Sequence, residues 1–251
     1  MGVLPADPAL VALLALGAAV IGFSKTALGG LGVVSVAIFA SVLPARQSTA
    51  AILMVLIVGD VIACWHYRRD PDWALIRRLL PAVVPGLLLG TLFLRVVSDD
   101  VLRRAIGAVL LVLLVLQLWV KARGRSEEGT TSGGRRARAW GAGSAMGFTT
   151  MTANAAGPVM TLYLSASGID KRRFVGTSAW FFLIVNLCKV PFSVGLGLLH
   201  PQDVGRAAVL APAVLVGALL GYALVTRISQ RAFDVAVLLA SAVAAAALLL
   251  G

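Results

Sequence analysis

Gly22-Phe23-Ser24-Lys25-Thr26 is the stretch that decides the fold, because the chain repeats its pattern 125 residues later as Gly147-Phe148-Thr149-Thr150-Met151. Gly32 recurs at the same distance as Gly157. Farther along each half, four residues recur at a distance of 131 residues: Pro81, Gly86, Gly90 and Ser98 return as Pro212, Gly217, Gly221 and Ser229. An internal duplication within a very apolar chain is typical of membrane transporters built from two repeats.

The composition indicates lipid as the surrounding solvent. Of the 251 residues, 59% are hydrophobic and 13% are charged, whereas a soluble domain carries roughly 25% charged residues. About 20 helical residues cross a hydrocarbon core of roughly 30 Å. Six apolar runs reach that length, at about 47–66, 79–97, 103–120, 174–194, 207–226 and 232–250. The net charge of +11 comes from Lys and Arg in the short connections, where they face lipid headgroups, so nucleic acid is not an expected partner.

Each half begins with a longer apolar segment that is expected to break near its middle. The segment 9–43 contains Ser24-Lys25-Thr26 and Gly29-Gly30, and the segment 139–167 contains Gly157-Pro158. Glycine weakens a helix interior and proline removes a backbone donor. Irregular backbone at membrane depth requires cover by protein or a water-filled cavity. Each break is therefore a candidate site.

The basic residues predict the topology. If each broken segment is a hairpin that returns to its starting side, 15 Lys and Arg collect on one side and 5 on the other. The positive-inside rule favours this arrangement over one with single crossings throughout, which gives almost no bias. We therefore expect two inverted-topology repeats, 1–120 and 139–251, each a broken helical hairpin plus three transmembrane helices. The basic linker loop 121–138 would be cytoplasmic, and both termini extracytoplasmic.

Three ionisable residues lie within apolar segments: Lys25, Asp60 and Lys189. A central Lys or Asp costs about 2.5–3.5 kcal/mol on insertion scales, so these residues must be paired, hydrated or lining a pathway. Two cations and one anion leave a net positive interior that suits an anionic solute. The alternatives are that Lys189 reaches the interface by snorkelling and that Asp60 forms a purely structural pair with one lysine.

The breaks supply further groups that can bind oxyanions. A helix that begins at a break points free N–H groups and the positive end of its dipole toward the gap. Asn186 and Lys189 share a helix face, and Asp60 is a candidate for proton coupling because burial favours its neutral form. The predicted substrate-binding residues are Ser24, Lys25, Thr26, Gly29, Gly30, Thr149, Thr150, Thr152, Asn154, Gly157, Asn186 and Lys189. The sequence predicts no metal site and no cofactor.

These motifs resemble those of a known family. The stretch from Gly22 to Gly32 is similar to the first motif of the TauE/SafE sulfite-exporter family of bacterial permeases. The second motif is matched by Gly147–Pro158, followed by Tyr163, Asp170-Lys171, Phe174, Gly176-Thr177, Phe182, Asn186 and Lys189. The resemblance covers nearly the full length, and it implies a polytopic plasma-membrane permease often linked to sulfite or organosulfonate anions. Ser24-Lys25-Thr26 replaces a commoner, glycine-richer version of the first motif.

The sequence therefore predicts an all-α polytopic membrane protein that moves a small anion, with sulfite, sulfonates such as sulfoacetate, and carboxylates as candidates in that order. The expected mechanism is alternating access, and the expected direction is export. An anion channel and a membrane scaffold are the alternative classes, and an enzyme fits least because no nucleophile–base pair is apparent. Membrane lipid surrounds the protein, and a homodimer is a further alternative to packing of the GxxxG motifs within one chain.

Overall fold

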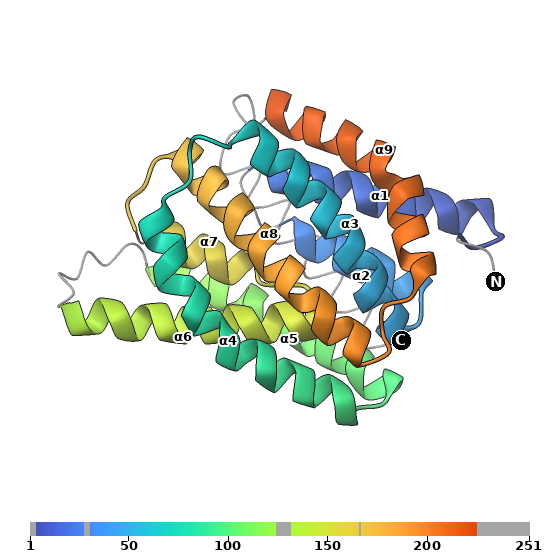
Figure 1. Cartoon of the computed structure of the whole chain (residues 1–251), viewed down its shortest axis with the longest axis horizontal. Helices are drawn as coiled ribbons and strands as arrows, with labels where there is room; N and C mark the ends of the chain where they lie inside the picture. The colour runs from blue at the N-terminus through green and yellow to red at the C-terminus, as the bar shows by residue number, and fades with distance from the viewer. Residues whose placement is uncertain (1–3, 28–30, 124–131, 166, 225–251) are drawn as a thin grey trace.

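The computed structural model describes residues 4–27, 31–123, 132–165 and 167–224. These residues form nine helices and no strand (Figure 1). The helices are α1 (Pro8–Thr26), α2 (Gly32–Val42), α3 (Ala45–His66), α4 (Trp73–Val96), α5 (Asp99–Arg123), α6 (Ser132–Ala153), α7 (Gly157–Ser165), α8 (Lys171–Gly195) and α9 (Pro201–Leu224).

Five of these helices, α1, α3, α4, α8 and α9, are long and apolar enough to cross a membrane. The predicted runs 47–66, 79–97, 103–120, 174–194 and 207–226 fall on α3, α4, α5, α8 and α9, whereas the run 232–250 lies outside the described residues. Large apolar side chains such as Leu89, Leu92 and Leu219 are exposed on α4 and α9, as lipid contact requires. The prediction of an all-α polytopic membrane protein is confirmed.

Both long segments are interrupted where the sequence predicts. Helix α1 ends at Thr26 and α2 begins at Gly32, and α6 ends at Ala153 before α7 begins at Gly157. Helix α2 folds back along α1, because Gly32 N–H donates to Ser24 Oγ at 3.1 Å while Ser35 Oγ donates to the Gly17 carbonyl at 2.8 Å. Residues farther along α2 thus contact residues nearer the start of α1, so the two helices are antiparallel and form a hairpin.

Each repeat packs its first helix against a helix of the other repeat: α1 lies along α9, and α6 lies along α4 (Figure 1). At Gly22 an added Cβ would strike the Val214 carbonyl oxygen, and at Gly147 it would strike the Val83 carbonyl oxygen. Gly22 and Gly147 are 125 residues apart, and Val83 and Val214 are 131 apart. The contacts therefore repeat with the same two offsets as the sequence.

The GxxxG glycines lie in these same two interfaces. A Cβ at Gly86 would strike the Ser144 carbonyl oxygen, and one at Gly217 would strike the Ala19 carbonyl oxygen. These pairs are again equivalent by the offsets of 131 and 125 residues. Close backbone approach of this kind is what small residues permit in membrane helix pairs. The motifs thus serve packing within the chain; the inversion of one repeat relative to the other stays a prediction.

The stretch 121–138 is predicted as a linker loop, but helices extend into it from both ends. Helix α5 continues to Arg123 and α6 begins at Ser132, while residues 124–131 lie outside the described residues. Arginine has a high helix propensity, so an Arg-rich composition does not by itself end a helix.

Candidate functional site

Lys25 and Asp60 form an ion pair in the interior, between α1 and α3. Lys25 Nζ lies 2.6 Å from Asp60 Oδ1, and the side chains are 13% and 0% exposed respectively. The ammonium also lies 4.5 Å from the centroid of the Phe182 ring on α8. The carboxylate compensates the charge of Lys25, and the slight exposure keeps that ammonium accessible.

Asn186 of α8 completes the surroundings of Asp60. Its Nδ2 donates to Asp60 Oδ2 at 2.7 Å, so each carboxylate oxygen faces a nitrogen from a different helix. Asp60 and Asn186 occupy equivalent positions in the two repeats when a one-residue gap is allowed in the alignment. The contact therefore joins residues that the sequence offset pairs with one another.

Lys189 occupies a different environment, at the second break. Its Nζ donates to the Thr150 carbonyl at 2.7 Å, to Thr150 Oγ1 at 3.2 Å and to Asn154 Oδ1 at 2.5 Å. The Thr150 carbonyl also accepts from the Asn154 backbone N–H at 3.1 Å, so the ammonium is a second donor to this carbonyl at the end of α6. With Lys189 1% exposed, the snorkelling interpretation is wrong. Thr150, Asn154 and Lys189 together hold the break in place.

The cluster holds two lysine side chains and one carboxylate. Lys25 and Asp60 compensate each other, whereas the hydrogen-bond acceptors of Lys189 are neutral oxygens. The first turn of α7 adds N–H groups without intrahelical acceptors and the positive end of a helix dipole. Asn154 supports the turn before α7 with φ of 50°, a conformation that asparagine tolerates better than most residues. Donors of this kind can bind an anion.

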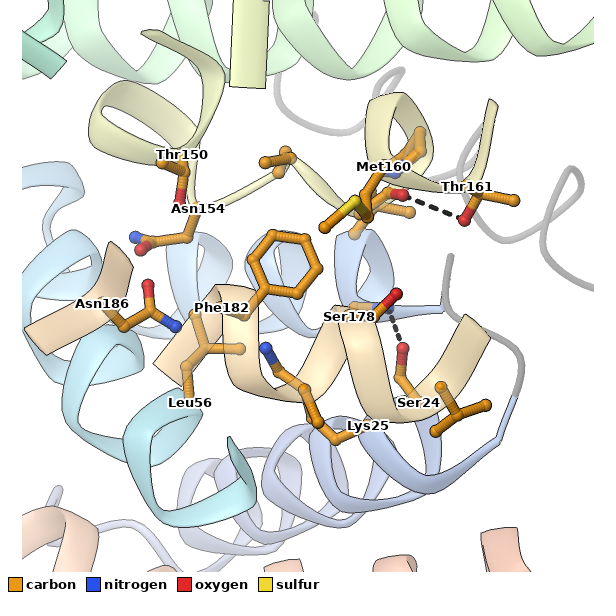
Figure 2. Close-up of a pocket in the computed structure, with 18 of the residues that line it drawn as sticks. Ser24, Lys25, Leu56, Thr150, Asn154, Met160, Thr161, Ser178, Phe182 and Asn186 are labelled. Atoms are coloured by element: carbon orange, nitrogen blue, oxygen red, sulfur yellow. Dashed lines mark hydrogen bonds between the residues drawn. The ribbon is translucent and has the colours of Figure 1, made fainter. Parts of the chain in front are cut away.

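A cavity of about 60 Å³ lies between the two breaks. Figure 2 shows Lys25, Asn186 and Phe182 directed toward it from one side, and Thr150 and Asn154 from the other. One buried water needs roughly 10–15 Å³ by this measure, so the space suits a solute of a few heavy atoms. The wall is completed by Ser24, Ala27, Gly32, Val33, Leu56, Ala155, Ala156, Gly157, Pro158, Met160, Thr161, Phe174, Val175, Ser178 and Ala179.

Six of the predicted binding residues meet at this cavity: Ser24, Lys25, Thr150, Asn154, Gly157 and Asn186. Asp60 and Lys189 lie behind its wall and bind residues that form it. Gly29 and Gly30 lie outside the described residues.

Three of the threonines predicted to bind substrate direct their hydroxyls to backbone carbonyls outside the cavity. Thr26 Oγ1 donates to the Ala218 carbonyl at 2.8 Å, in the interface between α1 and α9. Thr149 and Thr152 donate to carbonyls four residues back in α6, at 2.7 and 2.8 Å. Because a helix turns 100° per residue, only some of several adjacent threonines can face one cavity.

Sequence reasoning missed Ser178 and Phe182 as site residues, although both line the cavity. They precede Asn186 at steps of four residues on α8, which places all three on one helix face. This spacing was a usable signal. Among the residues that the structure describes, no three His, Cys, Asp or Glu side chains could together hold a metal ion.

Comparison with known proteins gives one match. The family model described as sulfite exporter TauE/SafE matches residues 14–248. No curated protein and no solved structure matches the chain. The matched range includes both breaks and every residue of the cavity wall. The chain therefore belongs to the sulfite exporter TauE/SafE family, a family of multi-pass membrane transporters of sulfur anions.

Proposed function

We propose that this protein exports a small sulfur oxyanion or organosulfonate, such as sulfite or sulfoacetate, across the plasma membrane, and that the anion binds in the cavity between the two breaks. The observation that carries the proposal is the position of Lys25, whose ammonium lines a cavity beside the first turn of α7, in a cluster of two lysines and one carboxylate. Preorganised donors in a low-dielectric site bind anions more strongly than the same donors in water.

Lys25 would bind the anion directly. An ammonium has three donors, and the contact with Asp60 Oδ1 leaves others for a solute oxygen. Ser178 Oγ has no hydrogen-bond partner among the described residues and can donate to a second oxygen. The volume of about 60 Å³ favours sulfite over longer sulfonates in this conformation, because a solute much larger than a few waters requires the wall to move.

Alternating access would arise from the duplication. Two inverted repeats with a site at their shared axis can expose that site to either side in turn. The site would then be the fixed point, while the α1–α9 and α4–α6 interfaces move as units. Asp60 is the candidate for proton coupling, since it lies against Lys25 and Asn186. In this arrangement the linker 121–138 is cytoplasmic and both termini are extracytoplasmic.

The test is flux of labelled sulfite in liposomes containing the purified protein, with Lys25→Gln as the principal variant. We expect uptake to fall at least about 100-fold, because removal of one buried charge–charge contact costs roughly 3 kcal/mol or more. Lys171→Gln is the matched control, since Lys171 is exposed at the start of α8. Undiminished flux in Lys25→Gln would contradict the site. Stimulation of uptake by unlabelled sulfite on the far side is expected for a carrier and not for a channel.

A further inference from the structure

The orientation of the Asn186 side chain is fixed by Asp60. Asp60 lies 2.6 Å from the Lys25 ammonium, and in the ionised form of this pair its carboxylate can only accept hydrogen bonds. Asn186 must therefore turn its NH₂ group toward Asp60, as the 2.7 Å contact from Nδ2 to Oδ2 shows. Its carbonyl oxygen, Oδ1, is consequently the end of the amide that does not contact Asp60, and Figure 2 shows this oxygen on the side of Asn154.

Asn186 Oδ1 is a buried acceptor without a hydrogen-bond partner among the described residues. Asn186 is 1% exposed and forms part of the cavity wall. The nearby amide of Asn154 is committed elsewhere, because its Nδ2 donates to the Thr49 carbonyl at 3.1 Å and its Oδ1 accepts from Lys189. A buried polar atom that stays unpaired is costly, so this oxygen requires a donor from the occupant of the cavity.

We propose that the transported species is a monoanion that carries its own O–H or N–H donor, such as hydrogen sulfite, and that Asn186 selects it. This inference rests on the proposed function. The negatively charged oxygens of the solute would face Lys25, and the donor hydrogen would face Asn186 Oδ1. A fully deprotonated oxyanion would instead place lone pairs against that carbonyl oxygen. Specificity of this kind comes from a repulsive element as much as from an attractive one.

A site built to hydrogen-bond a solute donor discriminates strongly against the analogue that lacks the donor, because the site's own polar group then stays unpaired. The unpaired acceptor Asn186 Oδ1 therefore sets the class of solute more sharply than the total charge does. Asp60 acts here as a positioning residue, since it fixes which end of the Asn186 amide faces the solute.

Sulfamate and methanesulfonate are the matched probes, because both are singly charged, have the same shape and differ only in NH₂ against CH₃. Calorimetric titration of the detergent-purified chain is expected to show sulfamate binding at least about tenfold more tightly, which corresponds to about 1.4 kcal/mol. Equal affinities would overturn the inference and leave the proposed function standing, since a bound water would then satisfy Asn186. Binding of neither probe would contradict both.

Two variants test the assignment to Asn186. In Asn186→Leu the affinity ratio of the two probes is expected to fall to within about twofold, because the acceptor is gone. In Asp60→Asn the same collapse is expected with Asn186 intact, because the amide is then free to turn; a purely structural role of Asp60 would change both affinities and leave their ratio unaltered. Lys171→Gln should keep the wild-type ratio. A wild-type ratio in either variant would overturn the assignment.

Discussion

Both breaks interrupt a helical segment in the same way, and they differ in which helix supplies the lysine ammonium group. At the first break the lysine belongs to the broken segment itself, as Lys25. The equivalent position of the second break, 125 residues on, is Thr150, and its ammonium arrives from α8 as Lys189. Lys25 faces a carboxylate, whereas Lys189 faces neutral oxygens.

This difference separates two tasks that a symmetric pair would have to share. Lys189 uses three donors on protein acceptors and is 1% exposed, so it stabilises the turn that positions α7. Lys25 lines the cavity with an accessible ammonium, so it is the cation that can meet a solute. The two breaks thus interrupt equivalent helices and differ in the contacts of their lysines.

The strongest test of this difference is to remove each lysine, first alone and then together with Asp60. Lys25→Gln leaves Asp60 buried without its cation and is expected to lower the free energy of unfolding by roughly 3–5 kcal/mol. The double variant Lys25→Gln/Asp60→Asn should recover most of this loss while remaining inactive. Thermal unfolding in detergent measures both. A double variant no more stable than the single one would show that Asp60 does not depend on Lys25.

Lys189→Met is expected to cost roughly 2–3 kcal/mol, because Asn154 Oδ1 loses its donor inside the protein, whereas the Thr150 carbonyl still accepts from the Asn154 backbone N–H. Here Asp60→Asn should give no recovery, since the hydrogen-bond acceptors of Lys189 are neutral. The measurement is the same unfolding series, with Lys171→Met at an exposed position as control. Recovery by Asp60→Asn would mean that the two lysines share one role.

Unlike the two breaks, the α1–α9 and α4–α6 interfaces should respond alike to equivalent substitutions. Gly22→Ala and Gly147→Ala each place a methyl group against a carbonyl of the facing helix, and each should destabilise the protein by about 1–3 kcal/mol. Gly141→Ala is the control, since a Cβ there has no atom within 4 Å among the neighbours that the structure describes; it should stabilise slightly through helix propensity. Strongly unequal losses at Gly22 and Gly147 would contradict the equivalence of the interfaces.

The smallest effect is expected at Thr149, which the sequence placed in the binding site. Thr149→Val removes a bond to the helix's own Ala145 carbonyl, so sulfite affinity should stay within about twofold and stability within about 1 kcal/mol. Thr150→Val is the matched comparison, because Thr150 contacts Lys189 and lines the cavity. Equal loss of sulfite affinity in both variants would return Thr149 to the site.

The fold could be predicted from local features of the sequence. Apolar runs of spanning length give α3, α4, α8 and α9 directly, because lipid requires apolar helices of that length. Gly-Pro at 157–158 and the polar stretch around Lys25 give the breaks, because backbone donors and side-chain propensities act within a few residues. The bounds of α5 and α6 could not be predicted from their Arg-rich ends, since arginine suits both helix and loop.

The sequence by itself determined that this protein is a membrane transporter with an internal duplication, two broken segments and ionisable residues inside its apolar segments, because these properties depend on composition and on near neighbours in the chain. Only the tertiary structure decided which lysine meets Asp60, which one closes the second break, and which way Asn186 turns. These choices depend on how α8 is rotated and shifted against α3 and α6, and helix register of that kind is set by packing over many distant contacts.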